Sequence, residues 1–117
     1  MRETLFIDYF KSRDGCEVLL EDNGFIVYRI KDKECFIAEM STRTELRGSG
    51  VGKKMIGKLS VIAREANCEF LTANIHMWDP GKENTLAAAL ATGFKVIHAS
   101  NDVILISLDL TGEKWAA

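Results

Sequence analysis

The sequence predicts one α/β (α+β) domain in which helices pack on a mixed sheet, with the element order αβββαβαββ. The 117-residue length suits a single domain spanning residues 1–117. Short apolar segments of strand length flank turn pairs such as Asn23-Gly24 and Asn101-Asp102, a pattern typical of hairpins. Two other segments carry apolar residues at helical spacing, which predicts helices between the strands.

The N-terminal third is expected to form a short helix and then three strands. Residues 3–12 place four apolar side chains at helical spacing, which predicts an amphipathic helix; they are Leu5, Phe6, Tyr9 and Phe10. Turns are expected at Asn23-Gly24 and at residues 31–34. They separate three strands, which span residues 16–22, 25–30 and 34–42.

The rest of the chain alternates helices with strands. From Val51 onward apolar residues recur every three or four positions, which predicts a helix of about 16 residues that ends at Asn67. An alanine-rich helix over residues 82–92 is expected to end at Gly93, because glycine commonly caps helix C-termini. The remaining strands are expected over residues 69–77, 94–100 and 102–110.

Composition narrows the function classes. A net charge of −2 argues against nucleic-acid binding, and no apolar run has the length of a membrane span. No signal peptide is recognisable at the N-terminus. The cysteines are three, widely spaced and without a CxxC pair, which predicts reduced thiols in a cytoplasmic protein. With His76 and His98 as the only histidines, no metal site is expected.

A glycine-rich segment at residues 46–55 (LRGSGVGKKM) precedes the longer helix. A Walker A loop would need a glycine in place of Arg47 and a hydroxyl in place of Lys54, and a dinucleotide fingerprint starting at Gly48 would need a glycine in place of Lys53. The glycines nevertheless permit close approach to a helix N-terminus flanked by positive side chains. The segment therefore predicts a pyrophosphate site, and a glycine-rich turn with solvated lysines is the alternative.

The chain resembles the GNAT family of N-acetyltransferases. The family signature [QR]xxGx[GA] is matched by residues 47–52 (RGSGVG), and Gly93-Phe94 matches a recurrent pair after the last helix. The resemblance covers residues 17–110. It implies a mostly antiparallel sheet with helices on both faces, and acetyl-CoA as the donor in direct transfer to an amine within a ternary complex. The acceptor would be a protein lysine, an N-terminus or a small amine.

Two further implications of the resemblance concern partners. A homodimer is expected, with the apolar segment VILISLDL (residues 103–110) as a candidate contact. The alternative to an enzyme is a non-catalytic module that binds CoA or another protein.

The resemblance also assigns cofactor-binding residues. Backbone groups of three residues before the loop would contact the pantetheine arm, the loop would hold the pyrophosphate, and Asn84 would contact the cofactor. Asn84 could instead cap a helix. The residues assigned to the pantetheine arm are Met40, Ser41 and Thr42, and those assigned to the loop are Arg47, Gly48, Ser49, Gly50, Val51, Gly52 and Lys53.

Three residues are candidates for the general base: Glu34, His76 and Glu39. Each also has a structural explanation, as a turn residue, a hydrogen-bonded strand histidine and a solvated charge. Positioning of the amine alone, with water carrying the proton, is a further alternative. Many relatives protonate the leaving thiolate with a tyrosine, but the matching position here is Ala89 or Ala91.

Overall fold

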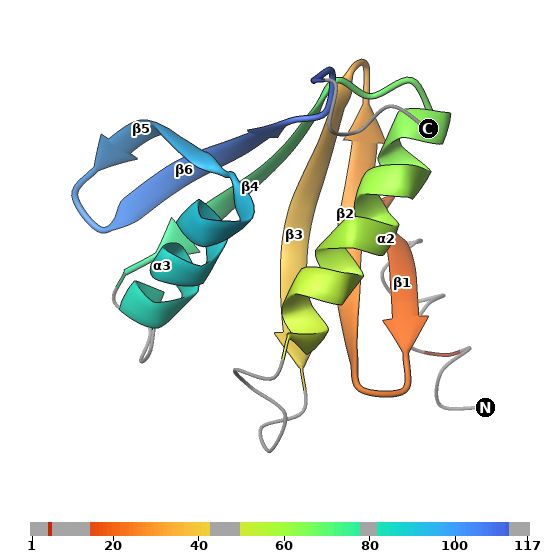
Figure 1. Ribbon diagram of the computed structural model, residues 1–117, viewed down its shortest axis with the longest axis horizontal. Helices are drawn as coiled ribbons and strands as arrows, with labels where there is room; N and C mark the ends of the chain where they lie inside the picture. Colours follow the sequence, from red (N-terminus) through yellow and green to blue (C-terminus); the bar gives the residue numbers. More distant parts are fainter. Residues whose placement is uncertain (1–4, 6–14, 43–49, 78–81, 113–117) are drawn as a thin grey trace.

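The computed structural model describes residues 5, 15–42, 50–77 and 82–112. Within them the predicted order βββαβαββ is confirmed, whereas the helix predicted over residues 3–12 lies, except for Leu5, outside the described residues. The elements in Figure 1 are β1 (Glu17–Glu21), β2 (Gly24–Lys31), β3 (Glu34–Thr42), α2 (Val51–Glu65), β4 (Phe70–His76), α3 (Lys82–Thr92), β5 (Lys95–Ser100) and β6 (Val103–Asp109).

The strands form one six-stranded sheet in the order β1-β2-β3-β4-β6-β5. Every pairing is antiparallel except that of β3 with β4, whose parallel arrangement follows from the crossover through α2. The mixed, mostly antiparallel sheet is thus confirmed. Strand β6 lies between β4 and β5, so the segment expected to contact a second copy has both backbone edges paired within the sheet.

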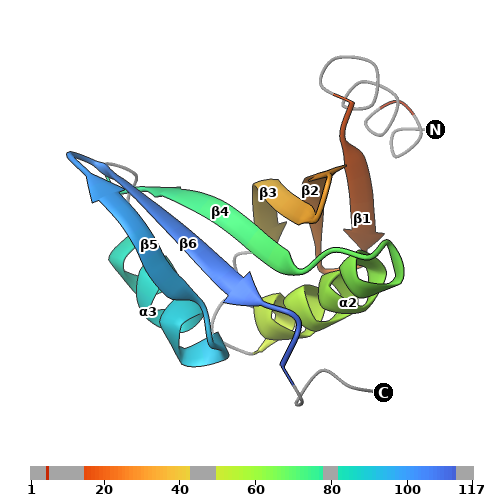
Figure 2. The same cartoon turned by 90° about the horizontal axis from the view of Figure 1, so that it is seen from above.

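Both described helices lie on the same face of the sheet (Figure 2). Helix α2 crosses β2 and β3, and α3 lies over the half formed by β4, β6 and β5 (Figure 1). The expectation of helices on both faces is therefore not met by the described part of the chain.

Helix α2 forms because its apolar residues fall on one side. Met55, Ile56, Leu59 and Ala63 are buried, and they pack on the sheet in one hydrophobic cluster. Ser60, also buried, is satisfied because its hydroxyl donates to the Ile56 carbonyl at 2.8 Å. The other buried members of the cluster are Ile26, Tyr28, Cys35, Ile37, Cys68, Leu71, Ile75, Phe94, Ile106, Leu108 and Leu110.

The two helices end in the same way. After α2, Cys68 N–H donates to the Ala63 carbonyl at 2.9 Å, and Asn67 takes the left-handed conformation with φ 66°. After α3, Phe94 N–H donates to the Ala89 carbonyl at 3.1 Å, and Gly93 has φ 118°. These are the bonds of a Schellman cap, and both predicted helix ends are confirmed.

One predicted turn is wrong by one residue. Glu21 pairs with Gly24, so the first hairpin turns at Asp22-Asn23 and not at Asn23-Gly24. Gly24 is already a strand residue, because it also pairs with Thr42 of β3. The turn predicted within residues 31–34 is confirmed by the pairing of Lys31 with Glu34.

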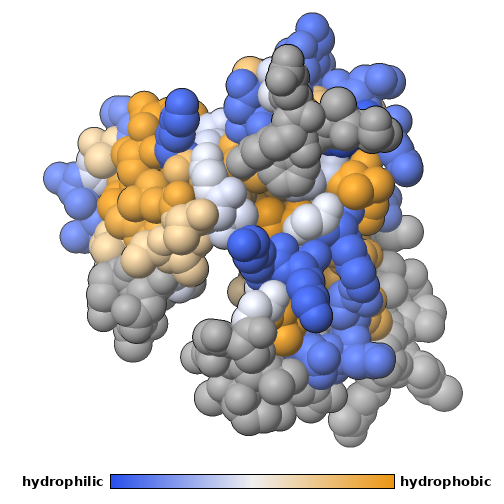
Figure 3. Space-filling model, in the orientation of Figure 1, coloured by the Kyte–Doolittle hydropathy of each residue, from blue (hydrophilic) through white to orange (hydrophobic). Residues whose placement is uncertain are grey.

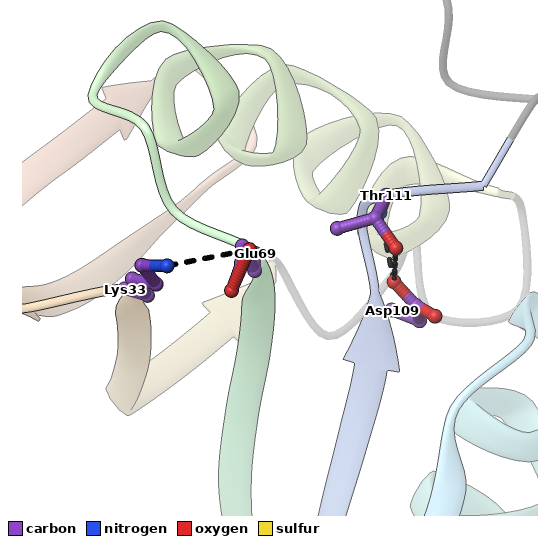
Figure 4. Close-up of polar contacts among 4 residues, drawn as sticks. All are labelled: Lys33, Glu69, Asp109 and Thr111. Carbon is purple, nitrogen blue, oxygen red and sulfur yellow. Dashed lines mark hydrogen bonds and ion pairs between the residues drawn. The ribbon is translucent and has the colours of Figure 1, made fainter.

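The β2–β3 turn, the start of β4 and the end of β6 meet at one end of the sheet (Figure 4). The Lys33 carbonyl accepts the Glu69 N–H at 2.7 Å, and the Glu69 carbonyl accepts the Leu110 N–H at 2.8 Å. The Lys33 ammonium lies 3.7 Å from the Glu69 carboxylate, but both side chains are exposed, so the backbone bonds matter more. Hydrogen bonds from the Thr111 hydroxyl and N–H lower the pKa of Asp109.

All three cysteines are buried and none forms a disulfide, as predicted. Cys35 is the most perturbed, because burial, with Cys68 and Glu34 nearby, raises the pKa of its thiol to about 12 from an ordinary 9.0. Since the folded pKa lies above the unfolded one, the contribution of the neutral thiol to stability is complete below pH 9.0 and is lost as the pH rises toward about 12.

We therefore expect the free energy of unfolding to fall above pH 9.0, the ordinary thiol pKa. Cys35 alone can contribute up to about 1.4 kcal/mol per pH unit. Urea denaturation at a series of pH values measures the slope, and Cys35→Ala should make it shallower. Tyr28 and Cys68, whose pKa values burial also raises, contribute to the slope that remains. Equal slopes in the two proteins would contradict this assignment.

Gly57 lies inside α2, and among the described residues no atom outside the adjacent helix backbone and the two chain neighbours comes within 4 Å of the position that its Cβ would occupy. Alanine should therefore fit there and should stabilise the helix by about 0.5–1 kcal/mol, as measured in urea. Gly52→Ala is the matched control in the same helix, and it should gain less, because its Cβ would lie 3.2 Å from the Met40 methyl carbon. A loss of stability in Gly57→Ala would show that close packing does require this glycine.

Candidate functional site

The sheet opens between its two parallel strands. Strands β3 and β4 pair only from Glu34–Phe70 to Ile37–Ala73, and then they diverge (Figure 1). Beyond that point residues 38–42 keep β2 as their neighbour, and residues 74–76 keep β6. The backbone edges that face each other across the opening therefore make no strand pair with one another.

A β-bulge bends β3 where the opening begins. Tyr28 pairs with Ile37 but Val27 pairs with Glu39, so Ala38 is an extra residue in β3. The bulge sends Ile37 and Met40 to the α2 side, where both pack with the core cluster. The sequence contains a signal for this bulge, because the inward apolar residues of β3 are spaced two residues apart and then three. The strand predicted over residues 34–42 did not include a bulge.

The N-terminus of α2 lies near the diverging end of β3 (Figure 1). Gly50 occupies the N-cap position with φ 91°, and its carbonyl accepts the first helical bond, from Lys54 N–H at 3.1 Å. Among the described residues no side chain caps this end, and the first turn contains no acidic residue. The helix dipole and the amides of this turn can therefore serve an anion, with exposed Lys53 and Lys54 adding positive charge.

Two of the predicted loop glycines differ in their surroundings. Among the described residues other than its chain neighbours, no atom lies within 4 Å of the Cβ position of Gly50, and its left-handed conformation disfavours any other residue. At Gly52 a Cβ would meet the end of the Met40 side chain at 3.2 Å. Gly50 thus keeps space open at the helix end, whereas Gly52 lets the helix pack closely on β3.

Five predicted cofactor residues lie wholly or partly outside the described part of the chain. Arg47, Gly48 and Ser49 lie outside the described residues. Thr42 ends β3 and Asn84 is the third residue of α3, but their side chains are outside the described part of the chain. Because α3 begins at Lys82, Asn84 is not at the N-cap position proposed as its alternative role.

The three candidate bases do not lie together. Glu34 is in the paired part of β3, where its carboxylate accepts the Thr72 hydroxyl at 2.8 Å. Glu39 directly follows the bulge residue Ala38, and His76 is the last residue of β4. Both are exposed and point to the face opposite α2, because their neighbours Met40 and Ile75 pack in the core. Only Glu39 and His76 therefore border the opening.

Neither position that matches the family tyrosine can donate a proton. Ala89 is half-buried against the core and Ala91 is exposed. Tyr28, the tyrosine within the described residues, lies in the core under α2, and burial, with Glu17 and Cys35 nearby, raises the pKa of its hydroxyl.

Two classes of site find no support in the described part of the chain. No helix there combines the length and hydropathy of a membrane span. No group of three or more His, Cys, Asp or Glu side chains there could hold a metal ion.

The mixed sheet and its helices have the fold of solved acetyltransferase structures. The model of the Acetyltransferase (GNAT) family matches residues 1–91, and the chain belongs to this family. No curated protein is detectably similar to it in sequence.

Solved structures share the fold at low sequence identity. The PaiA N-acetyltransferase of Thermoplasma acidophilum in complex with coenzyme A is 16% identical, with a TM-score of 0.72 over 92% of this chain and 70% of that chain. A GNAT family acetyltransferase of Elizabethkingia anophelis with acetyl-CoA bound is 15% identical, with a TM-score of 0.72 over 91% and 82%. The anti-CRISPR protein AcrVA5 is 19% identical, with a TM-score of 0.68 over 80% of this chain and 98% of that chain.

Proposed function

We propose that the protein is an N-acetyltransferase that moves the acetyl group of acetyl-CoA directly to a primary amine. The acceptor class comprises protein lysines, N-termini and small amines. The observation that carries the proposal is the opening between β3 and β4, which leads to the uncapped N-terminus of α2. Family membership supports acetyl transfer, and the two substrates would meet at the opening.

The residues at the opening fit the chemistry of acetyl-CoA. The amides of the first turn of α2, with Lys53 and Lys54, would hold the pyrophosphate, and Gly50 leaves room for it. The unpaired edge at Met40–Thr42 offers backbone donors and acceptors of the kind that the amide-rich pantetheine arm needs. When bound, acetyl-CoA supplies an acetyl group activated as a thioester.

The proton of the attacking amine would pass to Glu39. An amine attacks only when neutral, so a carboxylate beside the opening, acting directly or through a water, would assist it. Glu39 borders the opening from the exposed face, whereas Glu34 lies in the closed part and is already bound by Thr72. His76 is the second candidate, on the opposite strand.

Backbone groups would stabilise the negative charge that develops on the acetyl group. The N–H groups of β3 beyond the bulge can donate to the acetyl carbonyl oxygen, which gains negative charge during attack. With Ala89 and Ala91 in place of a tyrosine, no side chain from these positions protonates the leaving thiolate. Solvent would do so instead, since a thiolate is a stable leaving group near neutral pH.

The missing acid also favours a second candidate function, a module that binds CoA without catalysis. Release of free thiol in the presence of a panel of amines separates the two. Turnover of acetyl-CoA that depends on the amine supports the enzyme. Tight binding of CoA without release of thiol supports the module, and absence of binding contradicts both.

One test of the proposed function concerns cofactor binding. Gly50→Ala should weaken the binding of CoA by about tenfold, because φ 91° costs an alanine roughly 1–2 kcal/mol, and relief of this strain would move the amides of the helix end out of position for the pyrophosphate. Isothermal titration calorimetry measures the dissociation constant. Gly57→Ala, in the same helix but away from its N-terminus, is the control and should bind CoA as the unmodified protein does. Equal affinities of the two variants for CoA would show that the N-terminus of α2 is not part of the cofactor site.

Another test of the proposed function concerns the general base. Glu39→Gln should lower kcat/KM for the amine by about 100-fold or more, because general bases typically contribute that much, and it should leave CoA affinity unchanged. Glu34→Gln is the matched control and should retain nearly full activity. If His76→Gln loses activity and Glu39→Gln does not, the proton acceptor lies on β4.

A further inference from the structure

Asn74 lies at the narrow end of the opening between β3 and β4. The last residue pair of these strands joins Ile37 to Ala73, so Asn74 is the first residue of β4 without a partner on β3. On its other side it pairs with Leu105 of β6, which holds its backbone in the sheet. Figure 3 shows a notch where the strands diverge, between the half of the molecule that carries α3 and the half that carries α2.

The Asn74 side chain points away from both helices. Its neighbours along the strand, Ala73 and Ile75, pack with the core cluster on the helix side, and side chains alternate between the two faces of a strand. Glu39 points to the same face as Asn74, because the bulge turns the next residue, Met40, toward the core. A carboxylate from β3 and an amide from β4 therefore flank the narrow end of the opening on one face of the sheet.

Both side chains have polar atoms that are available to a ligand. Asn74 and Glu39 are exposed, and within the described part of the chain neither side chain forms a hydrogen bond or an ion pair. Thr72, two residues earlier on the same face of β4, differs because it is buried and its hydroxyl donates to Glu34 at 2.8 Å. The polar side chains of the closed part thus satisfy one another, whereas these two at the opening do not.

We propose that Asn74 binds the acceptor amine and makes the site specific for primary amines. The inference rests on the proposed acetyl transfer, in which Glu39 takes the proton, and adds a second contact from the opposite strand. The side-chain oxygen Oδ1 of Asn74 accepts one N–H of the amine, and the Glu39 carboxylate accepts the other. With both N–H groups held, the lone pair of the nitrogen is left for the thioester carbon.

The reaction balances with these two contacts. The nitrogen lone pair forms the C–N bond to the acetyl carbon, and the C–S bond breaks with its electron pair on sulfur. The proton that Glu39 accepts comes from the nitrogen, and the thiolate takes a proton from solvent. Asn74 exchanges no proton in any of these steps, so its role is to bind and orient the amine.

A secondary amine fits this pair of acceptors less well. It has one N–H group fewer, so a contact with Glu39 would leave Oδ1 of Asn74 without a donor. A site that hydrogen-bonds an N–H group rejects the analogue that lacks it, because the polar atom of the site is left unpaired. We expect a preference of about tenfold or more for primary over secondary amines.

Thiol release with matched amines tests this specificity. The acceptors are Nα-acetyllysine amide, alaninamide and butylamine, which represent the three acceptor classes, each beside the secondary amine made by adding one N-methyl group. Asn74→Ala should lower kcat/KM for the primary amine by about tenfold and should reduce the preference over the secondary amine by a similar factor. Ser100→Ala, which removes an exposed polar group of β5 on the same face, is the control and should change neither.

The pH dependence separates a contact with the amine from a structural role. Asn74→Asp keeps an oxygen at this position but adds a negative charge beside the amine, which favours the ammonium form and raises the pKa of the bound amine. Since only the neutral amine attacks, the rise of kcat with pH should move to higher pH in Asn74→Asp and stay in place in Asn74→Ala.

Amide NMR provides a measurement that does not need turnover. The side-chain NH2 signals of Asn74, identified by their loss in Asn74→Ala, should shift when the primary amine is added to the protein with CoA bound, and should shift less with the secondary amine. Turnover with an unchanged preference in Asn74→Ala would overturn this assignment and leave the enzyme standing. Absence of turnover with every amine would contradict the acetyl transfer, and Asn74 signals that then also stay in place would overturn the assignment with it.

Discussion

Four residue pairs between β3 and β4 are the connection on which the rest of the structure depends. They join the half of the sheet formed by β1–β3 to the half formed by β4–β6, and their parallel direction requires α2 to cross between the two. The backbone hydrogen bonds that the Lys33 carbonyl accepts from Glu69 and Phe70 fix where this pairing starts. Where it stops, the bulge at Ala38 bends β3, and the sheet opens. The short pairing of β3 with β4 therefore determines both the fold and the position of the candidate site.

Helix α2 serves the core and the site with different parts of its length. Its middle and C-terminal turns bury Met55, Leu59 and Ala63, which holds it on β2 and β3. Its first turn keeps its amides uncapped, and the contact between Gly52 and Met40 sets how near this turn lies to the strand. Because packing holds the helix, its N-terminus does not depend on a capping side chain for its position, and that end remains available to an anion.

Local patterns predicted the elements well, since helical spacing after Val51 and turn residues such as Asn101 act over a few positions. They did not predict strand order, because the placement of β6 beside β4 is decided by packing between distant segments. The turn at Asp22-Asn23 was placed one residue late, since Gly24 is held in β2 by its pairing with β3. At the site, the motif located Gly50 at the start of a helix. It could not say that Glu34 lies in the closed part of the sheet and Glu39 beside the opening, because that difference arises from a pairing that stops at Ile37.

The opening between β3 and β4 also has a consequence for the stability of the folded chain. Strand edges without a neighbour are the places where a fold opens and where proteases and other chains gain access. A ligand that lies between these edges would bind the folded chain and not the unfolded one, and would shift the balance toward the folded chain as its concentration rises. The stability of the folded chain would then rise with the concentration of its acyl donor.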